Sequence, residues 1–216
     1  MSSDARDAIL ARIRAANGAA ATPAETDAAY ASLPRPYRRA HHDPAATDVV
    51  ALFAERAADY RAVVERVPEA GLPGAIAAAV AGVTSLVVPD GLPGHWLAGL
   101  APGTRLVRDE PPLSAAELDR TFGVVTGCAA AIAETGTIIL DHGPGQGRRA
   151  LTLVPDFHLV VVRADQVAAD IADALARLDP ARPHTLVSGP SATSDIELIR
   201  VEGVHGPRNL HVLVSG

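Results

Sequence analysis

The chain has 216 residues, of which 48% are hydrophobic and 20% charged, and its formal net charge at pH 7 is −6. A chain of this length can bury one sizeable core, and Ala-rich stretches that alternate with Val, Ile and Leu runs predict an α/β fold. The acidic balance, without a basic block, excludes nucleic acid as a partner. No apolar run approaches the ~20 residues that a membrane-spanning helix needs, so no membrane span is expected.

Residue usage limits the chemistry further. All 19 basic residues are arginines, so no lysine can form a Schiff base or complete a phosphate-binding loop of the Gly-Lys-Ser/Thr type. Cys128 is the only cysteine, which excludes an ordinary iron–sulfur cluster, a zinc ribbon or an internal disulfide held by this chain alone. Its Gly-Cys-Ala-Ala context favours a small buried residue over a nucleophile. With no dinucleotide-binding glycine loop, we expect no bound cofactor, neither cluster nor tightly held flavin.

The N-terminal segment, residues 1–44, is predicted to be a helix followed by an extended linker, and residues 45–216 to be the α/β domain. Asp4, Arg6 and Asp7 stand where a signal peptide would be apolar, which predicts a cytoplasmic protein. A capped helix is expected to stop near residues 17–18, and residues 19–44 show little apolar periodicity. His41 and His42 are adjacent there; neighbours in an extended chain point opposite ways, which favours a solvent-exposed pair over a metal site.

After Asp48 the pattern alternates between helix and strand, as in a parallel sheet flanked by helices. A helix is predicted over residues 48–67, where the apolar residues have helical spacing. Further helices are predicted over residues 76–81, 95–100, 114–118 and 167–178. Strands are predicted over residues 85–88, 104–107, 122–126, 137–140, 158–163, 185–187 and 210–214, with all but the second of these placed in one central sheet.

A loop crowded with glycine and charge follows the buried strand predicted at residues 137–140. It runs from Asp141 through Gly145 and Gly147 to Arg148 and Arg149. Glycines let backbone amides approach a ligand closely, and two arginines can each donate a fork of hydrogen bonds to carboxylate or phosphate oxygens. The alternative is a solvated surface loop with two ordinary arginines. The loop pattern alone does not decide between an anion site and a surface turn.

Two more polar clusters adjoin predicted strands. Four hydroxyls lie within seven residues after the strand at 185–187, accompanied by a glycine and an acidic residue: Ser188, Gly189, Ser191, Thr193, Ser194 and Asp195. One hydroxyl suffices to cap a helix, so the surplus favours an anion-binding loop. Before the closing strand, Glu202 and His205 lie in a Gly/Pro turn. His205 is the best acid–base candidate, although a histidine there can equally hydrogen-bond a turn.

Four phrases occur in order along the chain: AETGTIILD, GPGQGRRALTLVPDFH, SGPSATSDIEL and EGVHGPR. Together they resemble the LUD-domain family, specifically its lactate-utilisation protein C branch, densely over residues 122–214 and more loosely before them. The resemblance implies a Rossmann-like fold related to ribose-5-phosphate isomerase, CoA-transferase and formyltetrahydrofolate cyclo-ligase. It also implies a role in oxidising L-lactate to pyruvate beside two companion proteins that carry iron–sulfur clusters.

The resemblance marks a pocket without assigning roles to its residues. It extends over Glu134, Thr135 and Gly136, the Asp141 loop, the Ser188 loop, and the turn from Glu202 to His205. Ligands of open α/β sheets collect beyond the carboxyl ends of strands, so the loops are expected to converge there. From residue types, Arg148 or Arg149 would bind the carboxylate of lactate, with Arg148 the first choice. His205 would take the hydroxyl proton, its ring oriented by Glu134, Asp195 or Glu202.

Two functions remain open on the sequence. In the first, the chain is a subunit without a redox centre that binds a small carboxylate or a partner within a lactate-oxidising assembly. In the second, it is a free-standing enzyme with the transferase or isomerase chemistry of its fold relatives, and Glu134 is the nucleophile or base. We favour the first, because the second rests on fold analogy alone. No metal site is predicted.

Overall fold

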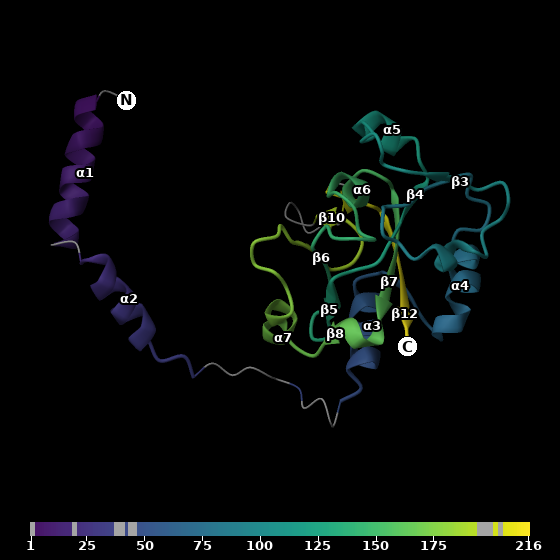
Figure 1. The fold of residues 1–216 in the computed structure, drawn as a ribbon, viewed down its shortest axis with the longest axis horizontal. Helices are drawn as coiled ribbons and strands as arrows, with labels where there is room; N and C mark the ends of the chain where they lie inside the picture. Colours follow the sequence, from purple (N-terminus) through teal and green to yellow (C-terminus); the bar gives the residue numbers. More distant parts are fainter. Residues whose placement is uncertain (1–2, 19–20, 37–41, 43–46, 194–200, 203–204) are drawn as a thin grey trace. The chain divides into compact units, whose positions relative to one another are not determined.

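Six parallel strands form the central sheet of the protein, described here from a computed structural model (Figure 1). The structure describes residues 3–18, 21–36, 42, 47–193, 201–202 and 205–216. The sheet order is β1 (Val63–Val67), β12 (Asn209–Ser215), β7 (Phe157–Arg163), β4 (Gly123–Thr126), β2 (Ser85–Val87) and β3 (Arg105–Val107). Every neighbouring pair is parallel, which confirms the predicted α/β fold.

A second sheet contains four short strands: β8 (Val167–Ala168), β5 (Ala130–Ile132), β6 (Thr137–Leu140) and β9 (Thr185–Val187). The prediction that residues 137–140 and 185–187 join the central sheet is therefore wrong. A tight turn joins β5 to β6, and β6 pairs antiparallel with both β5 and β9. A parallel neighbour would need a long crossover, which this short turn cannot provide. A two-stranded pair, β10 (Ala192–Thr193) and β11 (Val201–Glu202), follows.

The two faces of the central sheet pack against different partners, and β7 shows how. Leu159 and Val161 point into a core with α4 (Leu72–Ala79) and with Trp96 of the 3-10 helix η2 (Gly94–Leu97). Val160 and Val162 point the opposite way, into a core shared with α3 (Val49–Asp59) and the second sheet. Alternate residues of a strand face opposite sides, so an unbroken run of valine and leucine is what a sheet covered on both faces requires.

The remaining helices are short: α5 (Ala115–Asp119), α6 (Ala150–Leu153), α7 (Ile171–Ala176), and the 3-10 helices η1 (Glu69–Gly71) and η3 (Ala164–Gln166). The predicted helix over residues 48–67 is wrong in its second half. Helix α3 ends at Asp59, Arg61 takes a φ of 70°, and the β-branched residues that follow form β1 beside β12. The pairing available along the edge of β12 overrides the helical spacing of these valines.

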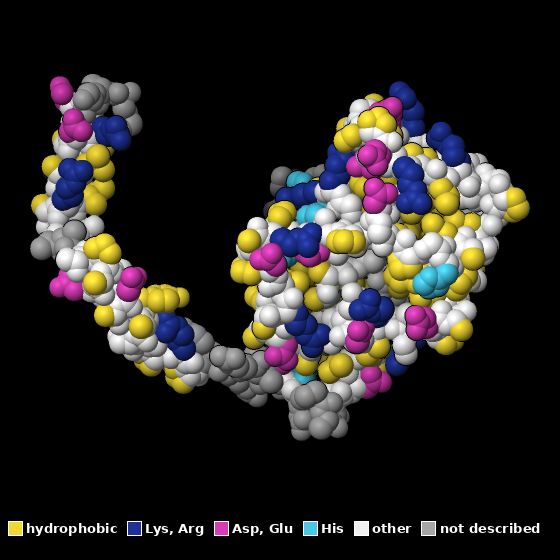
Figure 2. All heavy atoms as spheres, viewed as in Figure 1, with side chains coloured by type: hydrophobic (Ala, Val, Ile, Leu, Met, Phe, Trp, Pro, Cys, Tyr) yellow, Lys and Arg dark blue, Asp and Glu magenta, His cyan; other side chains and the backbone are white. Residues whose placement is uncertain are grey.

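The prediction of one helix over residues 167–178 is also wrong at its start. Val167 and Ala168 form β8, which pairs with β5, and α7 begins only at Ile171. The structure shows that a strand this short can be hidden within an amphipathic pattern, because its two residues satisfy either spacing. Figure 2 shows arginine and acidic side chains mixed over the face of residues 39–216 that is in view.

Contacts divide the chain into two units, residues 1–38 and residues 39–216. The first unit contains α1 (Ser3–Asn17), as predicted, and a second helix, α2 (Pro23–Ser32), in a stretch predicted to be extended. Thr22 and Glu25 form a reciprocal capping box at its start, and Pro23 occupies the first turn. These signals begin a helix even where apolar periodicity is weak. None of the described helices is long and apolar enough to cross a membrane.

Candidate functional site

A cavity of about 270 Å³ lies beside the amino ends of β7 and β12. Its polar lining comes from α6 and the residue before it, the start of β7, β9 and the segment after it, and the turn before β12: Arg149, Thr152, His158, Thr185, Ser188, Ser191 and His205. Segments from three separate parts of the sequence thus meet at one place. Four of these seven residues were predicted from the sequence, and Thr152, His158 and Thr185 were not.

Two hydrogen bonds join the serine segment to the His205 turn. The backbone N–H of His205 donates to Oγ of Ser191 at 2.9 Å, and the N–H of Ser191 donates to the carbonyl of Pro207 at 2.8 Å. Gly189 has a φ of 84° and packs against Tyr60, where a Cβ would lie 2.6 Å from Cβ of that tyrosine. Glycine at this position lets the backbone adopt a positive φ while it lies in contact with Tyr60. The exposed imidazole of His205 lines the opening of the cavity.

A chain of hydroxyl groups leads from the ETGT segment to the cavity. Oγ1 of Thr135 lies 2.7 Å from Oγ1 of Thr137, which lies 2.8 Å from Oγ of Ser188. Thr137 is buried at the start of β6, and Ser188 is exposed at the cavity. Consecutive hydroxyls of this kind can each donate and accept, so they fix one another's orientation.

His158 forms part of the cavity wall and is almost fully buried. Burial lowers the pKa of its imidazole to about 4, because the charged form is poorly solvated there. Its Nε2 lies 2.8 Å from Oγ1 of Thr126 on the neighbouring strand β4. The ring is therefore neutral at pH 7 and can serve the cavity as a hydrogen-bonding group rather than as a cation. A single polar residue opening an otherwise apolar strand was the only signal in the sequence.

The two adjacent arginines face different places. Arg149 lines the cavity, and no ion pair of its guanidinium occurs among the described residues. Arg148, the first choice for the anion, lies instead in a separate cavity and is paired with Asp109. The ion pair occupies the fork of donors that would have bound the ligand, so Arg149 is the better candidate for a carboxylate.

Contacts of the Asp141 carboxylate within the loop and with Arg182 hold the glycine-rich loop in place. Asp141 accepts hydrogen bonds from Nε2 of Gln146 at 2.7 Å and from the N–H of Gly143 at 3.1 Å, and it pairs with Arg182 at 3.1 Å. Gly147 has a φ of 70°, and a Cβ there would lie 2.5 Å from Cδ1 of Leu151. These residues shape the loop, and none of them lines the cavity beside Arg149.

The expected convergence occurs only in part: Arg149, at the end of the glycine-rich loop, lines the cavity with the serine segment and the His205 turn, whereas the rest of that loop does not. Strands β6 and β9 are antiparallel, with Leu140 opposite Thr185 and Ile138 opposite Val187. Asp141 and Ser188 consequently leave this pair at opposite ends. The cavity also lies at the amino ends of the parallel strands rather than at the predicted carboxyl ends. Gly145 does lie near the carboxyl ends of β4 and β7, in a smaller cavity of about 140 Å³.

Cys128 and Arg163 line that smaller cavity, together with Gln166. Cys128 is buried, and desolvation raises the pKa of its thiol to about 12. The neutral thiol at pH 7 is a poor nucleophile and a poor metal ligand, in agreement with the interpretation from sequence.

Glu134 lies outside the cavity. Its carboxylate pairs with Nε2 of His42, and the carboxylate of Asp170 lies close to both. His42 is thus partly buried and paired within the unit of residues 39–216, whereas the sequence favoured a solvent-exposed residue; His41 lies outside the described residues. Gly136 has a φ of 59° and packs against α3, where a Cβ would lie 2.4 Å from the backbone nitrogen of Ala57. Its requirement for glycine is structural.

Four of the predicted site residues have side chains that the structure does not describe. Ser194 and Asp195 lie outside the described residues, as do the side chains of Thr193 and Glu202. The backbones of Thr193 and Glu202 form β10 and β11. Proposed roles for these four residues remain predictions.

Comparisons with known proteins place the chain in a family. Residues 117–215 match the LUD domain. Over 188 residues the chain is 51% identical to lactate utilization protein C of Deinococcus radiodurans, covering 85% of this chain and 84% of that protein. The chain belongs to the LUD-domain family, in its lactate utilization protein C branch. The LUD match spans every residue that lines the cavity beside Arg149.

Other relatives agree. Lactate utilization protein C of Bacillus pumilus is 35% identical over 93 residues, covering 39% of this chain and 38% of that protein. A crystal structure of a DUF162 family protein from Deinococcus radiodurans superposes with a TM-score of 0.66 at 45% identity. The superposition covers 78% of this chain and 97% of that one, so the fold described here extends over nearly all of that protein.

Proposed function

We propose that this protein takes part in L-lactate utilisation as a component without a redox centre, and that it binds the carboxylate of lactate or pyruvate beside Arg149. The cavity that contains Arg149 carries the proposal, because a guanidinium, four hydroxyls and two imidazoles line one small space. The names of the relatives supply the substrate class. A volume of about 270 Å³ suits a small organic acid better than a dinucleotide.

The polar groups of the cavity match the groups of lactate. Arg149 would donate to the carboxylate, with the hydroxyls of Ser188 and Ser191 as further donors. Neutral His158 would hydrogen-bond without adding charge. His205, at the opening, would accept the proton of the substrate hydroxyl.

Oxidation of lactate to pyruvate releases two electrons and two protons. We propose that the electrons pass to two companion proteins that carry iron–sulfur clusters, because a cluster needs several thiolates and this chain has one cysteine. The raised pKa of the Cys128 thiol also supports placing the clusters on the companion proteins, since that side chain remains protonated at neutral pH.

Calorimetric titration with L-lactate, pyruvate and inorganic phosphate tests the binding step. We expect Arg149→Gln to bind lactate and pyruvate at least tenfold more weakly, as loss of a charge-assisted hydrogen bond of about 1.5–3 kcal/mol implies. Arg105→Gln is the matched control, because it removes the same charge from an exposed site on β3. Equal affinity of the wild type and Arg149→Gln for both carboxylates would contradict the proposed site.

The assembly is tested separately. Native co-purification, followed by a lactate-oxidation assay from which each subunit is omitted in turn, should show turnover only when this chain is present with its companions. Turnover that is unaffected by omitting this chain would contradict a role in the oxidation. Anion binding in the isolated chain does not depend on that outcome.

A further inference from the structure

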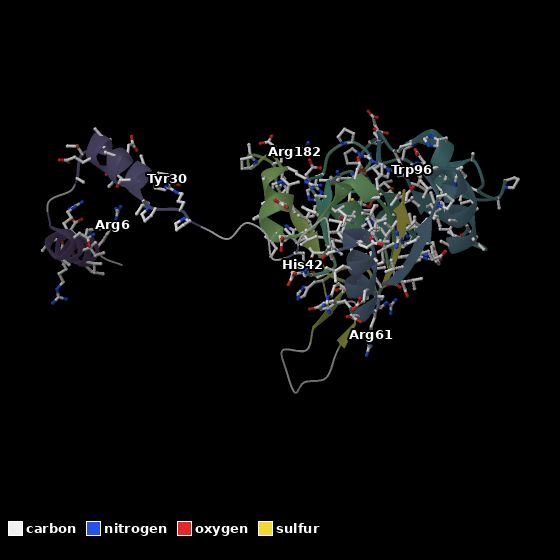
Figure 3. The ribbon with its side chains drawn as sticks, turned by 90° about the horizontal axis from the view of Figure 1, so that it is seen from below. Arg6, Tyr30, His42, Arg61, Trp96 and Arg182 are labelled. Atoms are coloured by element: carbon white, nitrogen blue, oxygen red, sulfur yellow. The ribbon has the colours of Figure 1, made fainter. Side chains whose placement is uncertain are left out.

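A cluster of one imidazole and two carboxylates lies outside the anion cavity and has no part in the proposed function. It consists of His42, Glu134 and Asp170, and one potential ligand atom from each lies within 4.8 Å of the other two. The three residues come from separate parts of the sequence, so no spacing motif could have revealed them. Figure 3 labels His42, which belongs to the unit of residues 39–216.

The backbone fixes two members of the cluster side by side. Beyond the paired residues of β5 and β8, the N–H of Ala133 donates to the carbonyl of Ala168 at 2.8 Å, and the N–H of Glu134 donates to the carbonyl of Ala169 at 3.2 Å. Glu134 and Asp170 are therefore held next to each other by main-chain hydrogen bonds. Sites on rigid backbone hold ligand geometry better than sites on free loops.

Asp170 is not used as a helix cap. It stands at the N-cap position of α7, but its side chain makes no capping hydrogen bond. Asp48, at the same position of α3, accepts from the N–H groups of Val50 and Ala51. Asp170 is also 3% exposed, whereas the side chain of Glu134 is 43% exposed and that of His42 is 31% exposed. The carboxylates of Asp170 and Glu134 share one space with the imidazole of His42, and a cation held there would offset the cost of placing two negative charges together.

We propose that His42, Glu134 and Asp170 bind a divalent transition-metal ion, with Zn²⁺ and Mn²⁺ as the best candidates. A nitrogen ligand with two carboxylate oxygens suits these ions, whereas Ca²⁺ and Mg²⁺ prefer sites made of oxygen alone. Two carboxylates neutralise the charge of the ion. Three protein ligands leave at least one coordination position, which the exposure of Glu134 and His42 opens to solvent or to a further ligand.

A bound ion would also link His42, which precedes α3 in the sequence, to Glu134 after β5 and Asp170 before α7. Metal binding that joins distant segments contributes to folding stability. Stabilisation by added metal is therefore a readout that does not depend on catalytic activity.

Protein dialysed against a chelator should bind one equivalent of Zn²⁺ or Mn²⁺ by calorimetry, with an increase in Tm. His42→Ala, Glu134→Gln and Asp170→Asn should each weaken binding at least tenfold. His95→Ala is the control, because His95 is exposed and lies outside the cluster. Circular dichroism establishes that each variant is folded; the first two alter partly exposed side chains and are expected to be.

Unchanged Zn²⁺ and Mn²⁺ affinity in folded His42→Ala and Glu134→Gln would overturn the site. An equal loss of affinity in His95→Ala would do the same, because it would show adventitious binding to surface histidines. The anion cavity is tested with Arg149→Gln, so failure of one proposal is distinguishable from failure of the other.

Discussion

The guanidinium of Arg148 is bound to both carboxylate oxygens of Asp109, with Nε donating at 2.6 Å and one terminal nitrogen at 3.0 Å. The same terminal nitrogen donates to the carbonyl of Leu113. This contact ties the glycine-rich loop to the segment after β3, and it directs Arg148 away from the cavity that contains Arg149. Two adjacent arginines with the same chemistry therefore have different roles.

Arg148→Ala should lower the free energy of unfolding by about 1–3 kcal/mol, because it leaves the mostly buried carboxylate of Asp109 without its ion-pair partner. Affinity for lactate should not change. Burial by itself would raise the pKa of Asp109, but hydrogen bonds from Arg148 and from the N–H of Leu113 outweigh it and hold the pKa below its usual value. The stabilisation is thus present above about pH 4 and is lost as the pH falls through the folded-state pKa.

Urea unfolding at neutral and acidic pH checks this prediction, with Arg105→Ala as the control for loss of a surface charge. The difference between the wild type and Arg148→Ala should shrink at low pH. A variant as stable as the wild type, or one that loses lactate affinity, would refute the structural role of Arg148.

Neutral His158 makes the protein sensitive to mild acid. Its folded-state pKa of about 4 lies below the usual value near 6.5, so the unfolded chain binds more protons between these two pH values. Stability should fall as the pH drops through this window, by on the order of 3 kcal/mol from this group, and flatten below it. In His158→Gln, which keeps a polar atom near Thr126, that slope should be smaller. Denaturant titrations across the window measure it, and an identical slope in both proteins would count against the assignment.

Cys128 should resist thiol reagents in the folded protein. Its buried thiol has a pKa raised to about 12, so hardly any thiolate exists at about pH 8. Labelling by a chromogenic disulfide reagent should be slow in buffer and rapid in denaturant. Stoichiometric labelling of the native protein within the mixing time would show that the thiol is accessible and ionised.

Gly136→Ala should destabilise the protein by roughly 2 kcal/mol or more, because the new Cβ would meet the backbone of α3 and a φ of 59° disfavours alanine. Gly74, within α4, has open space around it and no positive φ. Gly74→Ala should therefore be neutral or stabilising by about 0.5–1 kcal/mol. Thermal melting curves of the two variants provide the comparison; similar Tm values would rule out the packing explanation.

The sequence predicted the buried strands of the central sheet well, because covered parallel strands are written as continuous apolar runs such as residues 158–163. It failed where two patterns overlap. The valines at 63, 64 and 67 have helical spacing, and only their pairing with β12 decides that they form a strand. Helix α2 was missed because its evidence lies in the Thr22–Glu25 cap rather than in an apolar face.

The site was predicted by residue type more accurately than by geometry. Ser188, Ser191 and His205 were expected to meet, and they do. The expected place was wrong, because nothing in the sequence states that β6 and β9 are antiparallel and belong to a separate sheet. The difference between Arg148 and Arg149 depends on Asp109, almost forty positions earlier, and on the backbone direction at one turn. Such contacts between distant segments cannot be read from local pattern.

The position of β12 has a consequence for how the protein is made. This strand lies between β1 and β7, and its partner Val63 is about 150 positions from His211 along the chain. During synthesis on the ribosome, the edge of β1 that pairs with β12 stays unpaired until residues 209–215 have emerged. The anion cavity is incomplete until then, because Leu210 of β12 is one of its lining residues. Nascent chains stalled before this strand should consequently bind chaperones and fail to fold, since an exposed valine-rich strand edge can pair with other chains.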